Sequence, residues 1–239
     1  MKHIPFTKMQ AQGNDFVVLN GLNAELPELT EDFVRTITER RYGIGCDQLL
    51  VLAMLPDDQT DALLRIFNND GSEAANCGNG LRCIGDLLMR EMNKSRVSIA
   101  LEDRIVKAER ADGGIRVEMG AAKITAQTEA YVDIDICNTH RVFFEATEAF
   151  PTDRNVEIVT GQIANHVFID IIERGTGRTP ACGSGAGAAT AAIWHTEEHN
   201  RPQTIEMPGG TVTVSGSLDI MILEGTVSQI FEGVYSFGD

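Results

Sequence analysis

Two cysteines open closely similar glycine-rich segments, Cys77-Gly-Asn-Gly and Cys182-Gly-Ser-Gly, and both segments lead into helical patterns. A helix N-terminus carries unpaired backbone N–H groups and a partial positive charge, which lower the pKa of a cysteine placed there. The glycines allow a carboxylate to approach those N–H groups closely. Both cysteines are therefore candidates for acid–base chemistry beside a bound anion.

Two such thiols facing one another suit the inversion of a carbon centre. One cysteine, as thiolate, removes a proton from one face of the carbon, and the other, as thiol, returns a proton to the opposite face. The pair titrates as a coupled unit, because one member is ionised while the other is not. In an amino acid, the helix N-termini would stabilise the charge that develops on the α-carboxylate as the proton leaves.

The remaining cysteines lack this setting. Cysteine is among the most buried residue types, so we expect packing roles for Cys46, Cys83 and Cys137. No Cys-x-x-Cys pair occurs, which gives no support to zinc-ribbon or thioredoxin-type chemistry. An odd count of 5 cysteines, with no signal-peptide pattern in residues 1–10, indicates free thiols and a reducing compartment. We expect a cytoplasmic protein.

Metal and nucleotide chemistry are weakly supported. His195 and His199 have the i, i+4 spacing of metal ligands on a helix, but no third ligand is evident, so we expect a solvated face. The Gly183-x-Gly185-x-x-Ala188 pattern follows no apolar strand and lacks the βαβ context of a dinucleotide site. We therefore expect neither a metal nor a cofactor.

Composition limits the partners. The 239 residues include 20 basic and 35 acidic side chains, a net charge of −15, and no basic stripe that would bind a phosphate backbone. The longest apolar run, Leu49–Leu55, is far shorter than the roughly 20 residues that span a bilayer. The expected partner is a small molecule, not a nucleic acid or a membrane.

The cysteine segments lie among predicted strands. Thr30 is the predicted N-cap of a helix with Phe33 and Ile37 on its apolar face. Helices are also predicted after Cys77, with Leu81, Ile84 and Leu88 on one face, and from Gly183 to about His199. Apolar or alternating patterns predict strands at 16–19, 48–54, 62–68, 132–136 and 163–172.

The two halves of the sequence echo one another. Asn68-Asn69 and Glu173-Arg174 each lie nine and eight residues before a cysteine motif, and 13–18 is loosely repeated by 137–142. We therefore predict an α+β fold of two pseudo-symmetric lobes, each a mixed β-sheet wrapped around a central helix. The predicted lobes are 1–125, carrying Cys77, and 126–239, carrying Cys182, and the C-terminal strands could return to the first lobe.

These motifs resemble the diaminopimelate epimerase family of cofactor-independent two-cysteine epimerases and racemases. The resemblance spans most of the chain, in order. Its motifs are Gly13-Asn-Asp-Phe16, Gly43-Ile-Gly-Cys-Asp-Gln48, Phe67-Asn-Asn-Asp-Gly-Ser-Glu-Ala-Ala-Asn-Cys-Gly-Asn-Gly80 and Glu173-Arg-Gly with Ala181-Cys-Gly-Ser-Gly185. It implies epimerisation of LL- to meso-diaminopimelate without pyridoxal phosphate, in lysine and peptidoglycan precursor synthesis, by a homodimer.

The resemblance also implies site residues. Cys77 and Cys182 would be the acid–base thiols, and Glu173 would receive the α-amino group. Backbone N–H groups of four residues would hold the α-carboxylate: Gly78, Asn79, Gly183 and Ser184. The distal end of the substrate would be clamped by Arg174, Asn68, Asn138 and Asn155. Asn14 and Gln48 would line the pocket, and His140 would orient the catalytic groups.

The chain departs from the family pattern in loops that shape the pocket. The family's Gly-Asn-Pro-His becomes Cys137-Asn138-Thr139-His140, and its Gly-Pro-Ala near the C-terminus becomes Glu224-Gly225-Thr226. Neither change touches the two thiols. Two alternatives therefore stay open: a racemase of another amino acid that uses the same cysteines, and a non-catalytic amino-acid-binding homologue.

Overall fold

The computed structural model describes residues 2–55, 60–145, 147 and 149–238. The chain divides into two compact units, Met1–Arg110 with Val227–Asp239, and Ala111–Thr226. We call these unit 1 and unit 2. This division falls earlier than the expected boundary at 125–126, and the last strand belongs to unit 1.

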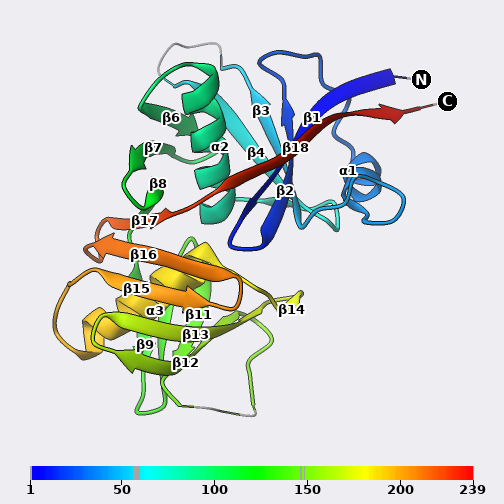
Figure 1. The fold of residues 1–239 in the computed structure, drawn as a ribbon. Helices are drawn as coiled ribbons and strands as arrows, with labels where there is room; N and C mark the ends of the chain where they lie inside the picture. The colour runs from blue at the N-terminus through cyan, green and yellow to red at the C-terminus, as the bar shows by residue number, and fades with distance from the viewer. Residues whose placement is uncertain (1, 56–59, 146, 148, 239) are drawn as a thin grey trace. The chain divides into compact units, whose positions relative to one another are not determined.

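Unit 1 is a mixed sheet with two helices (Figure 1). Its strands run in the order β18-β1-β2-β3-β4-β6-β7, with β5 added to one end of β4. The elements are β1 (Lys2–Ala11), β2 (Asn14–Asn20), α1 (Glu31–Thr38), β3 (Gln48–Ala53), β4 (Ala62–Asn68), β5 (Glu73–Ala74), α2 (Gly78–Glu91), β6 (Arg96–Ala100), β7 (Ile105–Ala111) and β18 (Ser228–Phe237).

Unit 2 is a mixed sheet with one helix. Its strands run in the order β9-β10-β11-β12-β13-β15-β16-β17-β8, with β14 added to β13. The elements are β8 (Gly114–Gly120), β9 (Lys123–Gln127), β10 (Tyr131–Ile136), β11 (Asn138–Phe143), β12 (Asn155–Ile163), β13 (His166–Glu173), β14 (Gly177–Arg178), α3 (Gly183–Thr196), β15 (Gln203–Met207), β16 (Gly210–Gly216) and β17 (Met221–Gly225).

The same topology occurs in both units. Strands β1 to β4, α2 and β6 of unit 1 correspond in order to β10 to β13, α3 and β15 of unit 2. In each series the second and third strands pair parallel, as do the fourth strand and the strand after the helix. The parallel pairs match in register, because Phe16 lies opposite Gln48 and His140 lies opposite Asn155. The predicted duplicated α+β architecture is confirmed.

Each sheet encloses its central helix. Helix α3 is buried from Gly183 to Trp194, and its small side chains allow β10 to β13 and β15 to β17 to pack closely around it. Helix α2 packs against β1 and β6. Unit 1 has a second core on the opposite face of its sheet, where Val34 and Ile37 of α1 meet Val17 and Leu19 of β2. Apolar residues on both faces explain why β2 reads as a continuous apolar run.

Local signals in the sequence account for several element boundaries. Thr30 caps α1 as predicted, since its hydroxyl accepts a hydrogen bond from the backbone N–H of Phe33 at 3.2 Å. Cys77 and Cys182 are the N-caps of α2 and α3. The strand predicted at 62–68 is β4.

Among the described residues, no helix is long and apolar enough to cross a membrane.

Two predicted boundaries are wrong. The strand predicted at 163–172 is β13, but it begins later, at His166, because a tight turn at Ala164 (φ 53°) and Asn165 separates it from the end of β12. Helix α3 ends at Thr196, before the predicted stop near His199. Glu198 there takes a left-handed conformation (φ 54°) and His199 N–H donates to the Trp194 carbonyl, a Schellman closure.

Candidate active site

The two cysteines have matching backbone environments. Each stands in extended conformation before its helix, and each Sγ accepts the N–H of the third helical residue at 3.4 Å, from Gly80 to Cys77 and from Gly185 to Cys182. The first two N–H groups of a helix have no acceptor within the helix. In α2 these belong to Gly78 and Asn79. In α3 they belong to Gly183 and Ser184, so each helix presents two donors beside a sulfur atom.

Predicted site residues in unit 1 gather at one end of its sheet. Asn14 begins β2, Gln48 begins β3 and Asn68 ends β4, and the pairing of these strands places all three at the same end. Gln48 Nε2 donates to Asn68 Oδ1 at 2.9 Å, and Asn68 Nδ2 donates to the Ser72 hydroxyl at 3.0 Å. The side-chain oxygen of Asn14 lies 4.0 Å from Cys77 Sγ.

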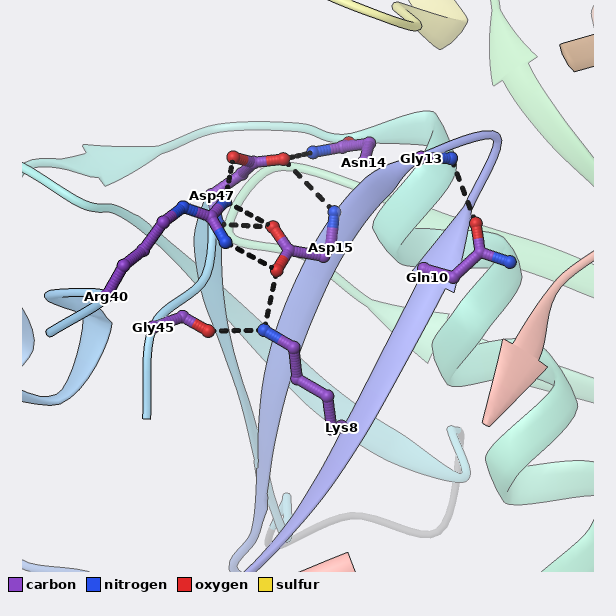
Figure 2. A network of polar contacts seen from close by, with 8 residues as sticks. All are labelled: Lys8, Gln10, Gly13, Asn14, Asp15, Arg40, Gly45 and Asp47. Carbon is purple, nitrogen blue, oxygen red and sulfur yellow. Dashed lines mark hydrogen bonds and ion pairs between the residues drawn. The ribbon is translucent and has the colours of Figure 1, made fainter. Parts of the chain in front are cut away.

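A network of ion pairs and hydrogen bonds fixes the side-chain amide of Asn14 (Figure 2). Asn14 Nδ2 donates to Asp47 Oδ2 at 2.9 Å, and Arg40 bridges Asp47 and Asp15 with contacts of 2.7 Å to each. Lys8 reaches Asp15 at 2.6 Å and also donates to the carbonyl of Gly45. Burial raises the pKa of Asp15, but the hydrogen bonds from Arg40 and Lys8 outweigh it and hold that pKa well below its usual range.

A second chain of hydrogen bonds reaches Asn14 from helix α2. Arg82 Nη2 donates to Asn79 Oδ1 at 2.9 Å and also to Gln12, and Asn79 Nδ2 donates to Asn14 Oδ1 at 3.3 Å. Arg82 is fully buried, and its Nε and Nη1 have no hydrogen-bond partner in the described chain. Burial lowers the pKa of Arg82 to about 10.

The predicted residues of unit 2 gather around Cys182. Its Sγ lies 3.4 Å from the Ser184 hydroxyl, and only 7% of the residue is exposed. Burial, followed by the charges of Glu173 and Glu157, raises the pKa of Cys182 well above its ordinary value. Burial also raises the pKa of Glu173, which accepts a 2.6 Å hydrogen bond from the Thr179 hydroxyl.

Three residues of unit 2 were predicted to bind the distal end of the substrate, and they differ in burial: Asn138, Asn155 and Arg174. Asn155 is buried, and its Oδ1 accepts the backbone N–H of Arg174 at 2.9 Å. The side chains of Asn138 and Arg174 are exposed, and the described chain provides no hydrogen bond to either. The structure thus connects Asn155 to the backbone of Arg174 and leaves the guanidinium of Arg174 at the surface.

The structure places two further buried charged residues, Glu157 and Arg82, in contact with predicted site residues. His140 Nδ1 lies 2.8 Å from Glu157 Oε1, and both side chains are fully buried beneath α3. Glu157 interrupts the apolar run of β12, which is the signal that could have drawn attention to it. Arg82 has a similar signal, because it lies between Leu81 and Cys83 on the buried side of α2.

The two candidate metal ligands, His195 and His199, contact different partners in the structure. His195 Nε2 lies 2.8 Å from Gln127 Oε1, and His199 Nε2 lies 2.8 Å from Glu197 Oε2. Across the residues that the structure describes, no group of three or more His, Cys, Asp or Glu side chains could hold a metal ion. All five cysteines are free thiols.

Solved structures share this fold. A phenazine biosynthesis protein of the PhzF family from Bacillus anthracis superposes with a TM-score of 0.75 at 18% identity, covering 99% of this chain and 100% of the other. A hydroxyproline epimerase from Agrobacterium vitis gives a TM-score of 0.71 at 14% identity, with 99% and 93% coverage. The fold is therefore the two-unit architecture common to these proteins.

Sequence comparison identifies the family. The diaminopimelate epimerase family model matches residues 6–125 and 132–224. A diaminopimelate epimerase from Halorhodospira halophila is 35% identical over 95% of this chain and 93% of its own length. Another, from Burkholderia thailandensis, is 32% identical over 97% and 98%. The chain belongs to the diaminopimelate epimerase family.

Proposed function

We propose that this protein is an isomerase that interconverts LL- and meso-diaminopimelate, with Cys77 and Cys182 as its acid–base groups. The observation that supports this best is the duplicated N-cap geometry. In both units a cysteine sulfur stands beside two backbone N–H donors at the start of a 14-residue helix. Family membership supports the substrate.

In the proposed reaction, one thiolate removes the proton from the α-carbon and the other thiol returns a proton to the opposite face. The electron pair of the broken C–H bond moves onto the α-carboxylate, where helix N–H groups stabilise the added charge. The donors would be the N–H groups of Gly78, Asn79, Gly183 and Ser184. After one turnover the two cysteines have exchanged protonation states, and the reverse reaction restores them.

Other polar groups would orient the substrate. Glu173 would accept the α-ammonium group, and Thr179 holds one of its oxygens at 2.6 Å. We assign the distal amino-acid group to Asn68, Asn155, Asn138 and Arg174, with Asn14 and Gln48 lining the pocket. The exposed guanidinium of Arg174 is free to meet a carboxylate with paired N–H donors.

The test is exchange of the α-hydrogen in deuterated water under reducing conditions. The protein would be given LL-diaminopimelate, meso-diaminopimelate and a panel of ordinary L-amino acids, including proline. We expect exchange with inversion for diaminopimelate alone. Exchange with another amino acid would keep the thiol chemistry and replace the substrate. Absence of exchange with every compound, in protein whose thiols are reduced, would contradict the proposal.

We also propose a homodimer in a reducing compartment such as the cytoplasm. Five free cysteines support the compartment. Strand β18 supports the dimer, because it pairs only with β1 in the described chain and exposes Ile230, Phe231 and Val234. Light scattering of Ile230→Lys/Val234→Lys against the unaltered protein tests this, since a dimer formed through β18 should fall to the mass of one chain.

A further inference from the structure

The two cysteines have equivalent backbone positions but opposite charged surroundings. On the helices, the fifth residue after Cys77 is Arg82, and the fifth residue after Cys182 is Gly187. On the third strand of each series, the third residue is Leu50 in unit 1 and Glu157 in unit 2. These strand residues face the same helix position, because a Cβ on Gly80 would lie 3.1 Å from Leu50 and a Cβ on Gly185 would lie 2.5 Å from Glu157.

Arg82 is a buried cation without a carboxylate partner. No ion pair joins it to an acidic side chain in the described chain, and its contacts are the amide oxygens of Asn79 and Gln12. Burying an unpaired charge is costly unless an opposite charge compensates it. The interactions that favour the charged form of Arg82 come from the thiolate forms of Cys83 and Cys77. Cys83 is fully buried, which raises its pKa, so of these two thiols Cys77 is the one that could compensate the charge of Arg82 as a thiolate.

The other charges around Cys77 balance or add to this effect. Asp15 and Asp47, which lie behind Asn14, are offset by Arg40 and Lys8 (Figure 2). On the same helix, Asp86 is paired with Arg90 and Arg110. Arg104 donates to the side chain of Asn76, the residue before Cys77, at 2.7 Å. The sum of these groups near Cys77 is positive.

The hydrogen bonds give the amides around Cys77 a single direction. Arg82 can only donate and the Asp47 carboxylate can only accept, so each fixes the neighbouring amide. Asn79 must turn its oxygen to Arg82, and Asn14 must turn its nitrogen to Asp47. The remaining nitrogen of Asn79 then meets the remaining oxygen of Asn14. The Cys77 thiol donates to that same oxygen at 4.0 Å, which favours the thiol, so the positive charges around Cys77 must outweigh this contact.

Around Cys182 the charges are negative. Glu173 comes from β13 and Glu157 from β12, and both disfavour a thiolate at Cys182. His140, from β11, contacts Glu157 at 2.8 Å. No arginine or lysine forms an ion pair with either glutamate in the described chain.

We propose that Arg82 is a positioning residue that keeps Cys77 as the thiolate of the unliganded protein, while Cys182 rests as the thiol. The proposal deepens the function proposed above. Only the catalytic role of the thiolate rests on that function. In that reaction, the resting enzyme accepts the isomer whose α-hydrogen faces Cys77. The opposite isomer must meet the form in which the proton has moved from Cys182 to Cys77.

The test is site-resolved alkylation. Unliganded protein would be treated briefly with iodoacetamide from pH 5 to 10, and mass spectrometry would give the extent of reaction separately for the Cys77 and Cys182 peptides. Midpoints of the pH profiles are compared instead of rates, because Cys182 is less accessible. We expect the Cys77 midpoint to lie below that of Cys182. The reverse order would overturn the proposal without any variant.

Arg82 variants test the cause. Arg82→Met should raise the Cys77 midpoint by about one pH unit, a roughly tenfold loss of reaction at pH 7, and leave Cys182 unchanged. Arg82→Lys should restore most of the shift, because it keeps the charge and loses the planar fork. Arg96→Met is the control, because Arg96 is an exposed arginine of β6 that pairs with Glu109 and is not among the charges counted around Cys77. An unshifted Cys77 midpoint in folded Arg82→Met would contradict the proposal.

Two other outcomes are also decisive. If Arg82→Met does not fold, the order of midpoints in the unaltered protein and the behaviour of Arg82→Lys decide the question. The measurement needs no turnover, so it separates this proposal from the proposed function. A low Cys77 midpoint in a protein that exchanges no α-hydrogen would support the charge assignment while removing the epimerase assignment.

Discussion

The two units place a cysteine in the same backbone geometry but surround it with different buried side chains. Both place a cysteine sulfur at a helix N-cap, bonded to the N–H of a glycine three residues on. Beneath the helix, unit 1 has Phe16 and Leu50, whereas unit 2 has His140 and Glu157 at the corresponding positions. Unit 1 instead carries its buried charge on the helix, as Arg82.

This difference shows how a duplicated fold can support a reaction that needs two unlike groups. The N-cap geometry is common to both halves, so it supplies what the proposed reaction needs from each, a sulfur beside unpaired helix N–H groups. In the proposed reaction the protonation states of the two cysteines must differ, and we assign that difference to the buried charged residues around each sulfur. Backbone repetition and side-chain divergence therefore serve separate parts of the same chemistry.

The largest expected effect comes from removing either sulfur. Cys77→Ser and Cys182→Ser should each reduce diaminopimelate epimerisation by more than about 1000-fold, because the serine hydroxyl is far weaker as an acid than a thiol. The measurement is the rate of stereochemical inversion by chiral chromatography. Cys46→Ala, a buried cysteine in the unit 1 core, is the control and should stay close to the unaltered rate. Activity in either serine variant would break the comparison, since one thiol would then suffice.

Replacing the buried His140–Glu157 pair with the corresponding unit 1 residues should first lower the free energy of unfolding and then restore part of it. Glu157→Leu leaves His140 buried beside an apolar group, and we expect a loss of about 3–5 kcal/mol in the free energy of unfolding. The double variant His140→Phe/Glu157→Leu copies the unit 1 pair and should be more stable than Glu157→Leu alone. Urea unfolding followed by circular dichroism measures both. A double variant no more stable than the single would show that the buried pair is not the reason for the loss.

The glycines that donate to sulfur should tolerate a methyl group unequally. Gly185→Ala would bring a Cβ to 2.5 Å from the Glu157 carboxylate, which is held by His140, so we expect a cost of about 1–3 kcal/mol. Gly80→Ala meets a Leu50 methyl at 3.1 Å, and that side chain can shift by a few tenths of an ångström. Its cost should be smaller. Equal losses in thermal unfolding of the two variants would remove this distinction.

Carboxylates in the two units should affect acid stability with opposite signs. The pKa of Asp15 is lowered in the folded protein, so its stabilisation of about 1–2 kcal/mol is present above about pH 4 and disappears as pH falls. The pKa of Glu173 is raised, so its contribution is present below its unfolded pKa and disappears as pH rises.

The matched pair Asp15→Asn and Glu173→Gln measures this. As pH rises from about 2 to 5, Asp15→Asn should lose stability relative to the unaltered protein, and as pH rises from about 4 to 7, Glu173→Gln should gain it. Thermal unfolding at each pH gives both trends. Parallel trends in the two variants would show that the surroundings of the two carboxylates do not differ as the contacts indicate.

Short-range patterns in the sequence predicted much of this structure. The repeated Cys-Gly-x-Gly segment located both N-caps, and the apolar patterns at 62–68 and 163–172 located β4 and most of β13, because these signals are local. Strand ends and helix ends that depend on one left-handed residue, Ala164 or Glu198, could not be predicted. Neither residue type favours that conformation by itself.

The buried charged residues Glu157 and Arg82 were not predictable for a different reason. Glu157 of β12 meets Gly185 of α3 and His140 of β11, and Arg82 reaches Gln12 across 70 positions of sequence. Such contacts depend on the tertiary arrangement. In a single sequence, Glu157 and Arg82 appear only as polar residues within apolar segments, which indicates burial without naming the partner.

The pairing of β1 with β18 has a consequence for synthesis of the chain on the ribosome. Lys2 lies opposite Phe237, and the first and last strands run side by side in unit 1 (Figure 1). Unit 2, in contrast, is one continuous stretch, Ala111–Thr226. Unit 2 is therefore translated whole while unit 1 still lacks an edge strand, so the half of the enzyme that begins first is the half completed last.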